Sequence, residues 1–334
     1  MQKNFLKKQY KIWINYVVGP LLFVILSFSI FNKIKQQENL PETWKIIKNS
    51  IADQWLLLLL MVLLMIVNWT LEARKWQVLI RPVQQVSIYT GFKAVLSGLS
   101  FGLFIPNGMG EYLGRMLYLN QGNRLKSIAV SIMGSLSQLL ITLVTGLAAL
   151  VYFINHDVLV IASTGLSDFW FRALMYVLIL ATLFFFFLYF KIGWVTSLFS
   201  YIPFVKRHRV FIQALTEFDY KTLFKVLFLS LLRYAVFIVQ YILMFEIFKV
   251  EMPLMNAVAG ICVMFLLIAI VPTIPIAELG VRGEVSLRIF GMLSKNAIGI
   301  ISTTVFIWLI NLIIPAIIGS LFVLTVRIFK KNGI

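Results

Sequence analysis

The chain has 334 residues, of which 60% are hydrophobic and only 13% are charged. Soluble domains carry roughly 45–50% apolar and about 25% charged residues, so the composition excludes a water-soluble fold and predicts a single membrane domain over residues 1–334. The formal net charge of +17 does not indicate nucleic-acid binding, because the basic residues form short clusters at the ends of apolar segments.

Six apolar segments are long enough to cross a bilayer as helices, which requires about 20 residues. They cover residues 13–31, 55–71, 127–155, 173–190, 223–248 and 297–326. The first segment follows several lysines and resembles a signal peptide, but its long apolar core and the absence of a clear small-x-small cleavage site favour an uncleaved anchor. We therefore predict an all-α integral membrane protein, a polytopic bundle of about six spanning helices.

Two further apolar regions are interrupted near their middle. The first covers residues 86–120 and breaks at 104–110, and the second covers 253–291 and breaks at 272–280. The residues that mark these breaks are Pro106, Gly108, Gly110, Pro275 and Gly280. Each second arm has about ten residues, or about 15 Å of helix, which is half of the hydrocarbon thickness. We predict two broken, re-entrant helical hairpins, although two tilted spanning helices in each region would give the same topology.

The distribution of basic residues predicts the orientation in the membrane. With the N-terminus in the cytoplasm, most of the lysines and arginines that follow the apolar segments lie inside, among them Arg74, Lys75 and Arg81. The loops at residues 155–168 and 248–252 are then outside and contain few basic residues. We expect a multi-pass protein of the bacterial cytoplasmic membrane with both termini on the cytoplasmic side.

A similar motif occurs in each half of the chain. An Ile-Pro pair is followed by glycine and then by Glu-x-x-x-Arg, ending at Arg115 in the first half and at Arg288 in the second. We therefore predict two half-repeats, over about 55–155 and 222–327, joined by a linking helix at 169–191 that inverts the second. Paired interrupted segments in inverted repeats are typical of transporters, with the binding site near the bilayer midplane.

Charged side chains near the two breaks are the candidate site. Charges inside a bilayer are costly and need a partner or a ligand, and the guanidinium fork of arginine matches a phosphate group. The candidate ligands of a lipid phosphate are Arg115, Arg282 and Arg288. The candidate ion-pair or proton-coupling groups are Glu111, Glu278 and Glu284. The same residues could instead neutralise one another and only hold the hairpins in the bundle.

No cofactor or metal site is expected from the sequence. Cys262 is the only cysteine, and the two histidines are far apart in loops. A multi-cysteine or histidine-based metal site is therefore not indicated, and no P-loop or other nucleotide-binding motif occurs.

The chain resembles the flippase-like membrane family typified by the transmembrane region of lysylphosphatidylglycerol synthases. The matching residues are Arg74-x-Trp76, then Ile105-Pro106-x-Gly108-x-Gly110-Glu111-x-x-x-Arg115, then Pro275-x-x-x-x-Gly280-Val281-Arg282-x-Glu284. The resemblance covers roughly residues 55–327. It implies a protein that moves or binds lipids in the bacterial cytoplasmic membrane.

The resemblance also sets the expected function. Bifunctional relatives carry a soluble transferase domain, whereas this chain stops shortly after its last apolar segment, so we expect a stand-alone lipid flippase that is not an enzyme. The partners would be membrane lipids rather than nucleic acid, and a homo-oligomer or a protein partner stays open. Two alternatives remain: a non-catalytic membrane partner protein and a membrane-embedded lipid-headgroup transferase.

Overall fold

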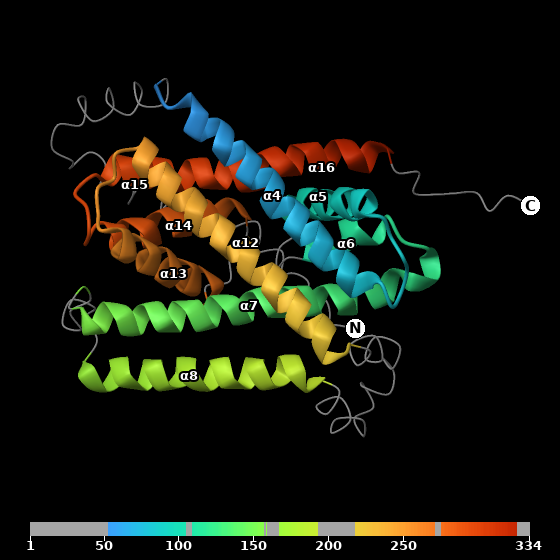
Figure 1. Ribbon diagram of the computed structural model, residues 1–334, viewed down its shortest axis with the longest axis horizontal. Coiled ribbons are helices and arrows are strands. Elements are labelled where there is room, and N and C mark those ends of the chain that lie inside the picture. The colour runs from blue at the N-terminus through green and yellow to red at the C-terminus, as the bar shows by residue number, and fades with distance from the viewer. Residues whose placement is uncertain are drawn as a thin grey trace, which may run out of the picture.

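The computed structural model describes residues 53–104, 109–156, 158, 167–192, 218–270 and 275–325, and its regular elements are all helices in these residues (Figure 1). The helices are α4 (Trp55–Ile80), α5 (Ile88–Phe104), α6 (Met109–Met116), η2 (Gln121–Asn123), α7 (Arg124–Asn155), α8 (Asp168–Phe190), α12 (Tyr220–Ile247), α13 (Leu254–Ile270), α14 (Pro275–Phe290), α15 (Ala297–Trp308), a π-helical turn η4 (Leu309–Ile313) and α16 (Ile314–Thr325).

Five helical segments of the described chain are long and apolar enough to cross a membrane. They are Trp55–Ile80, Gln121–Asn155, Phe169–Phe190, Tyr220–Ile247 and Ala297–Val323. These segments coincide with five of the six predicted spans, and the sixth, at residues 13–31, lies outside the described residues. The predicted all-α polytopic membrane fold is therefore confirmed.

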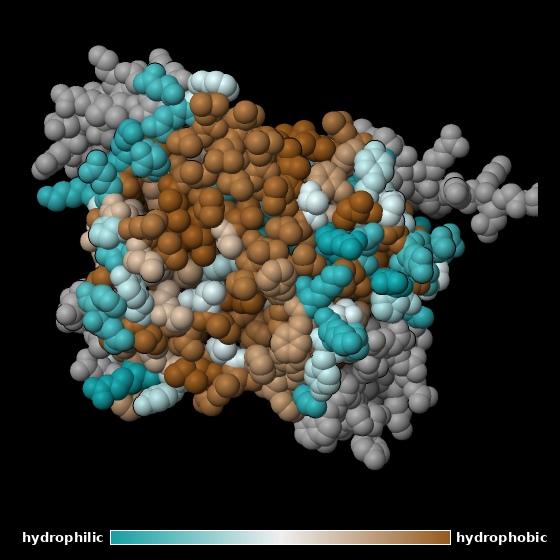
Figure 2. Space-filling view, in the orientation of Figure 1, coloured by the Kyte–Doolittle hydropathy of each residue, from teal (hydrophilic) through white to brown (hydrophobic). Residues whose placement is uncertain are grey.

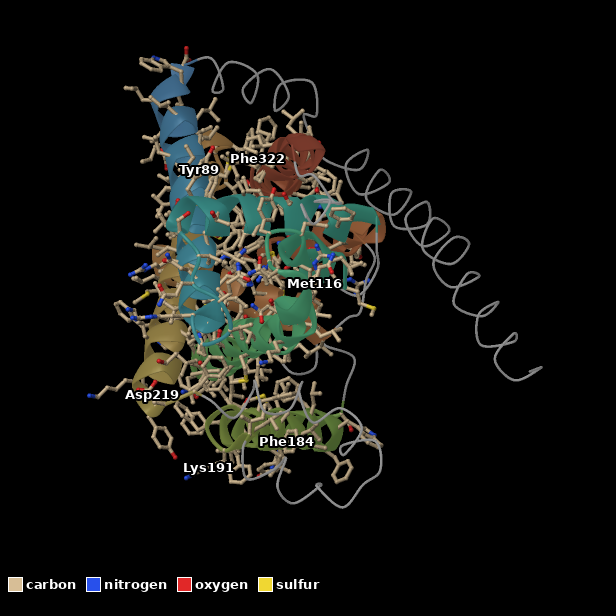
Figure 3. All side chains as sticks on the ribbon, turned by 90° about the vertical axis from the view of Figure 1, so that its right-hand side faces the viewer. Tyr89, Met116, Phe184, Lys191, Asp219 and Phe322 are labelled. Carbon is tan, nitrogen blue, oxygen red and sulfur yellow. The ribbon has the colours of Figure 1, made fainter. Side chains whose placement is uncertain are left out.

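The surface has the hydrophobic band that a bilayer requires. Figure 2 shows apolar residues across the middle of the molecule and hydrophilic residues gathered at its left and right edges. Helices α7 and α8, and the succession of α15, η4 and α16, run from one edge toward the other in Figure 1. Helix α8 lies at one end of the bundle, with Phe184 and Lys191, and α16 lies at the other, with Phe322 (Figure 3).

The two halves of the chain make reciprocal contacts. Helices α4 and α12 lie side by side and run in opposite directions (Figure 1). Helix α5 packs on α16 and α13 packs on α7, so the first arm of each hairpin contacts a long helix of the other half. Helix α6 packs on α7 in the same way that α14 packs on α15. This is the pattern that an inverted repeat produces, although the predicted half-repeat boundaries themselves stay a prediction.

The first hairpin is held together by backbone contact between α5 and α6. A Cβ atom on Gly98 would lie 2.6 Å from the carbonyl oxygen of Glu111, and one on Gly114 would lie 2.4 Å from the Cα of Gly98. No side chain fits between the helices at these positions, so glycine is required there. The close approach places the short α6, and with it Arg115, against the interior of the bundle.

The hairpin turns differ from the predicted ones. Helix α6 already begins at Met109 and α14 at Pro275, so Gly110 and Gly280 lie inside helices rather than in turns. Pro275 is the first residue of α14, where the missing N–H group of proline is harmless and its fixed φ favours the helix. The second arm is therefore 16 residues long instead of about ten. Pro106 and Gly108 lie outside the described residues.

A buried charge cluster between α4, α6 and α12

Glu72 of α4 is the centre of a buried cluster of charged side chains. Its Oε1 atom accepts a hydrogen bond from Nη2 of Arg115 at 3.1 Å. Its Oε2 atom lies 2.7 Å from Nζ of Lys75 and accepts from Nη1 of Arg233 at 3.0 Å. Glu72 is only 4% exposed. One carboxylate therefore connects α4, α6 and α12, which belong to both halves of the chain.

A second ring of contacts positions the two arginines. Arg115 also donates to Oε2 of Glu111 at 3.2 Å, one turn earlier on α6. Arg233 donates from Nε to Oδ1 of Asn68 at 2.7 Å, and its guanidinium lies 5.0 Å from the ring centre of Trp69. The guanidinium of Arg233 is thus held by hydrogen bonds and by an aromatic ring, and that of Arg115 by hydrogen bonds to two carboxylates.

The cluster carries more positive than negative charge. With ordinary ionisation, the three cations Lys75, Arg115 and Arg233 face the two carboxylates Glu72 and Glu111, which leaves one positive charge in excess. The desolvation of such groups is expensive unless their charges are matched. Intramembrane charges of this kind mark substrate or ion pathways, so the excess indicates a place where an anion would be stabilised.

Hydrogen-bond donors of the cluster also remain unused. The Nε atom of Arg115 and the Nδ2 atom of Asn68 are buried and have no hydrogen-bond partner among the described residues. Buried polar atoms in folded proteins nearly always find a partner, so exceptions of this kind need an explanation. Both atoms are donors only, and they would suit an acceptor such as a phosphate oxygen.

A smaller cluster lies between α14 and α12 in the second half. Arg282 of α14 donates from Nη2 to Oε1 of Glu278 at 2.6 Å and from Nη1 to the hydroxyl of Tyr241 at 3.5 Å. The Nε atom of Arg282 is another buried donor without a partner among the described residues. The pair of Glu278 and Arg282 therefore resembles the pair of Glu111 and Arg115, and the hydroxyl of Tyr241 on α12 accepts from Arg282 as Glu72 on α4 accepts from Arg115.

The structure separates one predicted ligand from the other two. Arg288 pairs with Glu284 at 2.9 Å, but its side chain is 75% exposed at the end of α14. Its ion pair involves neither Arg115 nor Arg282. The less exposed arginine of the second half is thus Arg282, at 16%, rather than Arg288, at which the sequence motif ends.

The sequence reasoning missed Glu72 and misplaced Lys75. The predicted span ended at residue 71, where the apolar run stops, and Lys75 was assigned to the cytoplasmic end. Helix α4 continues to Ile80, and Lys75 is only 2% exposed. The available signal was the spacing of Asn68, Glu72 and Lys75, which lie four and three residues apart and so share one helix face.

No group of three or more histidine, cysteine, aspartate or glutamate side chains that could hold a metal ion occurs among the described residues. The chemistry available in the cluster is therefore that of arginine, lysine, carboxylate and amide groups: binding of an anion, exchange of ion pairs and transfer of protons. The fold and this cluster define a multi-pass membrane protein with a buried charge cluster between α4, α6 and α12.

The chain belongs to the family described as the lysylphosphatidylglycerol synthase TM region, which it matches over residues 12–319. Membership confirms the resemblance seen in the sequence and associates the protein with membrane lipids. Comparison with curated proteins and with solved structures gave no match.

Proposed function

We propose that the protein is a lipid translocator that binds the phosphate of a lipid headgroup at the Glu72 cluster and moves the lipid between leaflets. The observation that carries this proposal is the excess positive charge, buried together with the unused donors of Arg115 and Asn68. A phosphate brings both the negative charge and the acceptor oxygens that the cluster lacks. The acyl chains would stay in the bilayer during the movement.

The proposed mechanism is an exchange of partners at Arg115. Its guanidinium now binds Glu72 and Glu111 through Nη2, which leaves Nε for a second oxygen of an incoming phosphate. Bidentate binding of phosphate would replace the contact to Glu72. Glu72 would then keep Lys75 and Arg233 as partners. Because the bond to Glu72 links α6 to α4, the exchange would loosen the hold on α6, while α5 stays packed on α4 and α16.

Arg282 would serve the same phosphate in the second half of the cycle. It lies on the α13–α14 hairpin and pairs with Glu278 and Tyr241. Two hairpins of inverted topology would then expose the site alternately to the two leaflets. Glu111, whose side chain is 39% exposed, is the carboxylate of the cluster best placed to exchange protons with water if transport is coupled to them.

We further propose that the protein acts as a transporter rather than as an enzyme, in the bacterial cytoplasmic membrane, with the basic end of the bundle inside. Support for the orientation comes from the cations at the end of α4 and the start of α12, where Arg74, Arg81 and Lys225 gather. Cytoplasmic loops carry an excess of such residues.

The test is transbilayer movement of headgroup-labelled lipids in proteoliposomes that contain the wild type, Arg115→Lys or Arg282→Lys. Lysine keeps the charge and removes the bidentate fork, so we expect each variant to remain folded and to move lipid at least about tenfold more slowly. Arg288→Lys is the matched control, because its side chain is largely exposed. No lipid movement by folded wild type, or unchanged movement in both variants, would reject the proposal or its site.

A further inference from the structure

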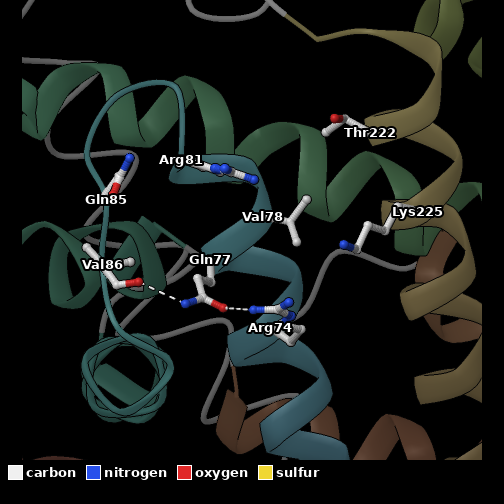
Figure 4. A pocket seen from close by; sticks show the side chains of 8 residues that line it. All are labelled: Arg74, Gln77, Val78, Arg81, Gln85, Val86, Thr222 and Lys225. Atoms are coloured by element: carbon white, nitrogen blue, oxygen red, sulfur yellow. Dashed lines mark hydrogen bonds between the residues drawn. The ribbon is translucent and has the colours of Figure 1, made fainter.

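A cavity of about 350 Å³ lies between the end of α4, the connection from α4 to α5, and the start of α12 (Figure 4). Its lining residues are Arg74, Gln77, Val78, Arg81, Gln85, Val86, Thr222 and Lys225. Three of these eight residues are cations and none carries a carboxylate. The cavity is separate from the Glu72 cluster, since it includes none of the side chains that bind Glu72.

One wall of the cavity is organised by hydrogen bonds. Nε2 of Gln77 donates to the backbone carbonyl of Val86 at 2.8 Å, and Oε1 of Gln77 accepts from Nη1 of Arg74. Figure 4 shows the guanidinium of Arg74 held at this wall, with Arg81 and Lys225 at the other sides of the opening. Arg74 therefore keeps further N–H donors for a ligand, because a guanidinium has five.

The surroundings favour a lipid headgroup over a soluble anion. Phe224 and Phe228, on the same helix as Lys225, are 60% and 58% exposed. In a membrane such side chains contact acyl chains, while the neighbouring cations meet the headgroup region. A phospholipid could therefore place its phosphate among the three cations and its chains along α12.

The cavity and the buried cluster are built on the same two helices, α4 and α12. Arg81, the residue that follows α4, lies nine residues after Glu72, or about 13 Å along the helix axis, and Lys225 precedes Arg233 by eight residues on α12, or about 12 Å. Helix α12 thus carries a cation at the basic end of the bundle and another, Arg233, about two turns deeper, where it pairs with Glu72 of α4. A phosphate that leaves the cavity along the α4–α12 seam would reach Arg233 and Arg115 next.

We propose that this cavity is the loading site for lipids whose headgroup has a net negative charge. Three cations without a carboxylate suit a phosphate diester with no amine, whereas the ammonium of a zwitterionic headgroup finds no anionic partner among the described lining residues. The inference rests on the proposed translocation, because it assigns the first step of the same path. Lipids with a positively charged headgroup would enter poorly.

The experiment is equilibrium binding of short-chain lipids to the purified protein in a neutral detergent. The probes are dioctanoyl phosphatidylglycerol, dioctanoyl phosphatidylcholine and inorganic phosphate. We expect the wild type to prefer the glycerol lipid over the choline lipid by about tenfold, and the double variant R81Q/K225Q to lose that preference. The matched control K126Q/K221Q removes two charges from the same end of the bundle, outside the cavity, and should keep the preference.

Three outcomes would overturn the assignment. They are equal wild-type affinity for the two lipids, a preference that survives in R81Q/K225Q, and a preference that disappears equally in the control. Inorganic phosphate that binds as tightly as the lipid and needs the same two residues would identify a soluble anion instead. Binding does not require transport, so a failed translocation assay with intact lipid preference would reject the transport proposal and leave this site standing.

Discussion

Replacing Glu72 by glutamine should destabilise the protein more than any other single charge removal in the described chain. The substitution keeps the volume of the side chain but removes the charge that three buried cations share, at 2.7, 3.0 and 3.1 Å. The amide of glutamine also turns two donors toward groups that are themselves only donors. Glu111 would remain as the single carboxylate beside Lys75, Arg115 and Arg233.

The expected magnitude follows from the burial of these groups. Breaking a buried ion pair by removing one partner costs about 3–5 kcal/mol, because an uncompensated charge is left behind. For a chain of this size that corresponds to a drop of roughly 5–15 °C in the melting temperature. Glu246→Gln is the matched control: its side chain is 69% exposed and its contact to Lys249 is 3.7 Å long, so it should change stability by less than about 1 kcal/mol.

The assay is thermal unfolding of the purified variants in detergent, followed by the loss of the monodisperse peak in size-exclusion chromatography. The double variant E72Q/K75Q restores the net charge of the cluster and should be more stable than the sum of the two single effects, a non-additivity of about 1 kcal/mol or more. An E72Q protein as stable as the E246Q control would refute the reasoning, and so would strictly additive effects in the double variant.

Two further predictions concern the hairpin and the start of α12. Gly114→Ala should destabilise the protein by about 1–3 kcal/mol, because the added Cβ would lie 2.4 Å from the backbone of α5. The control is Gly122→Ala, whose Cβ would meet no atom within 4 Å and which should not change stability in the same unfolding assay. The backbone N–H of Thr222 donates a hydrogen bond to the Asp219 carboxylate, which lowers the pKa of Asp219. The ionised carboxylate therefore stabilises the fold at pH values above the ordinary pKa of aspartate, and this stabilisation is lost as the pH falls. The difference in melting temperature between wild type and Asp219→Ala should therefore be present at pH 7 and become smaller as the pH falls through the ordinary pKa of aspartate.

The helices could be predicted because each is apolar over a length that only a membrane accommodates. The residues at which the helices end were harder to predict. Composition alone ended the second span at residue 71, yet α4 continues to Ile80 through Glu72 and Lys75. When a span is defined as an uninterrupted apolar run, a charged residue always ends it. This definition cannot distinguish a helix that ends from a helix that continues with a polar face packed against other helices. The same limit placed Lys75 at the membrane edge, although its charge is matched inside the bundle.

Part of the candidate site could be predicted from local spacing, and part depended on tertiary contacts. The four-residue interval places Glu111 beside Arg115 and Glu278 beside Arg282, and both pairs form. Nothing local joins Arg233 to Asn68, because 165 residues separate them and only the antiparallel packing of α4 and α12 brings them together. The motif also matched two pairs in the second half, and only burial distinguishes the one near Tyr241.

The unequal partners of the two arginines bear on how the hairpins would move. Arg115 is held by two carboxylates, one of which also binds two other cations, whereas Arg282 has one carboxylate and a tyrosine hydroxyl at 3.5 Å. Releasing Arg115 therefore disturbs charges on three helices, and releasing Arg282 disturbs a single ion pair. If the halves are inverted copies, their two open states differ in free energy through Glu72 and Tyr241. In the proposed mechanism, a phosphate that takes over the bonds of Arg115 would reduce that difference, so that lipid binding would favour opening of the α5–α6 hairpin.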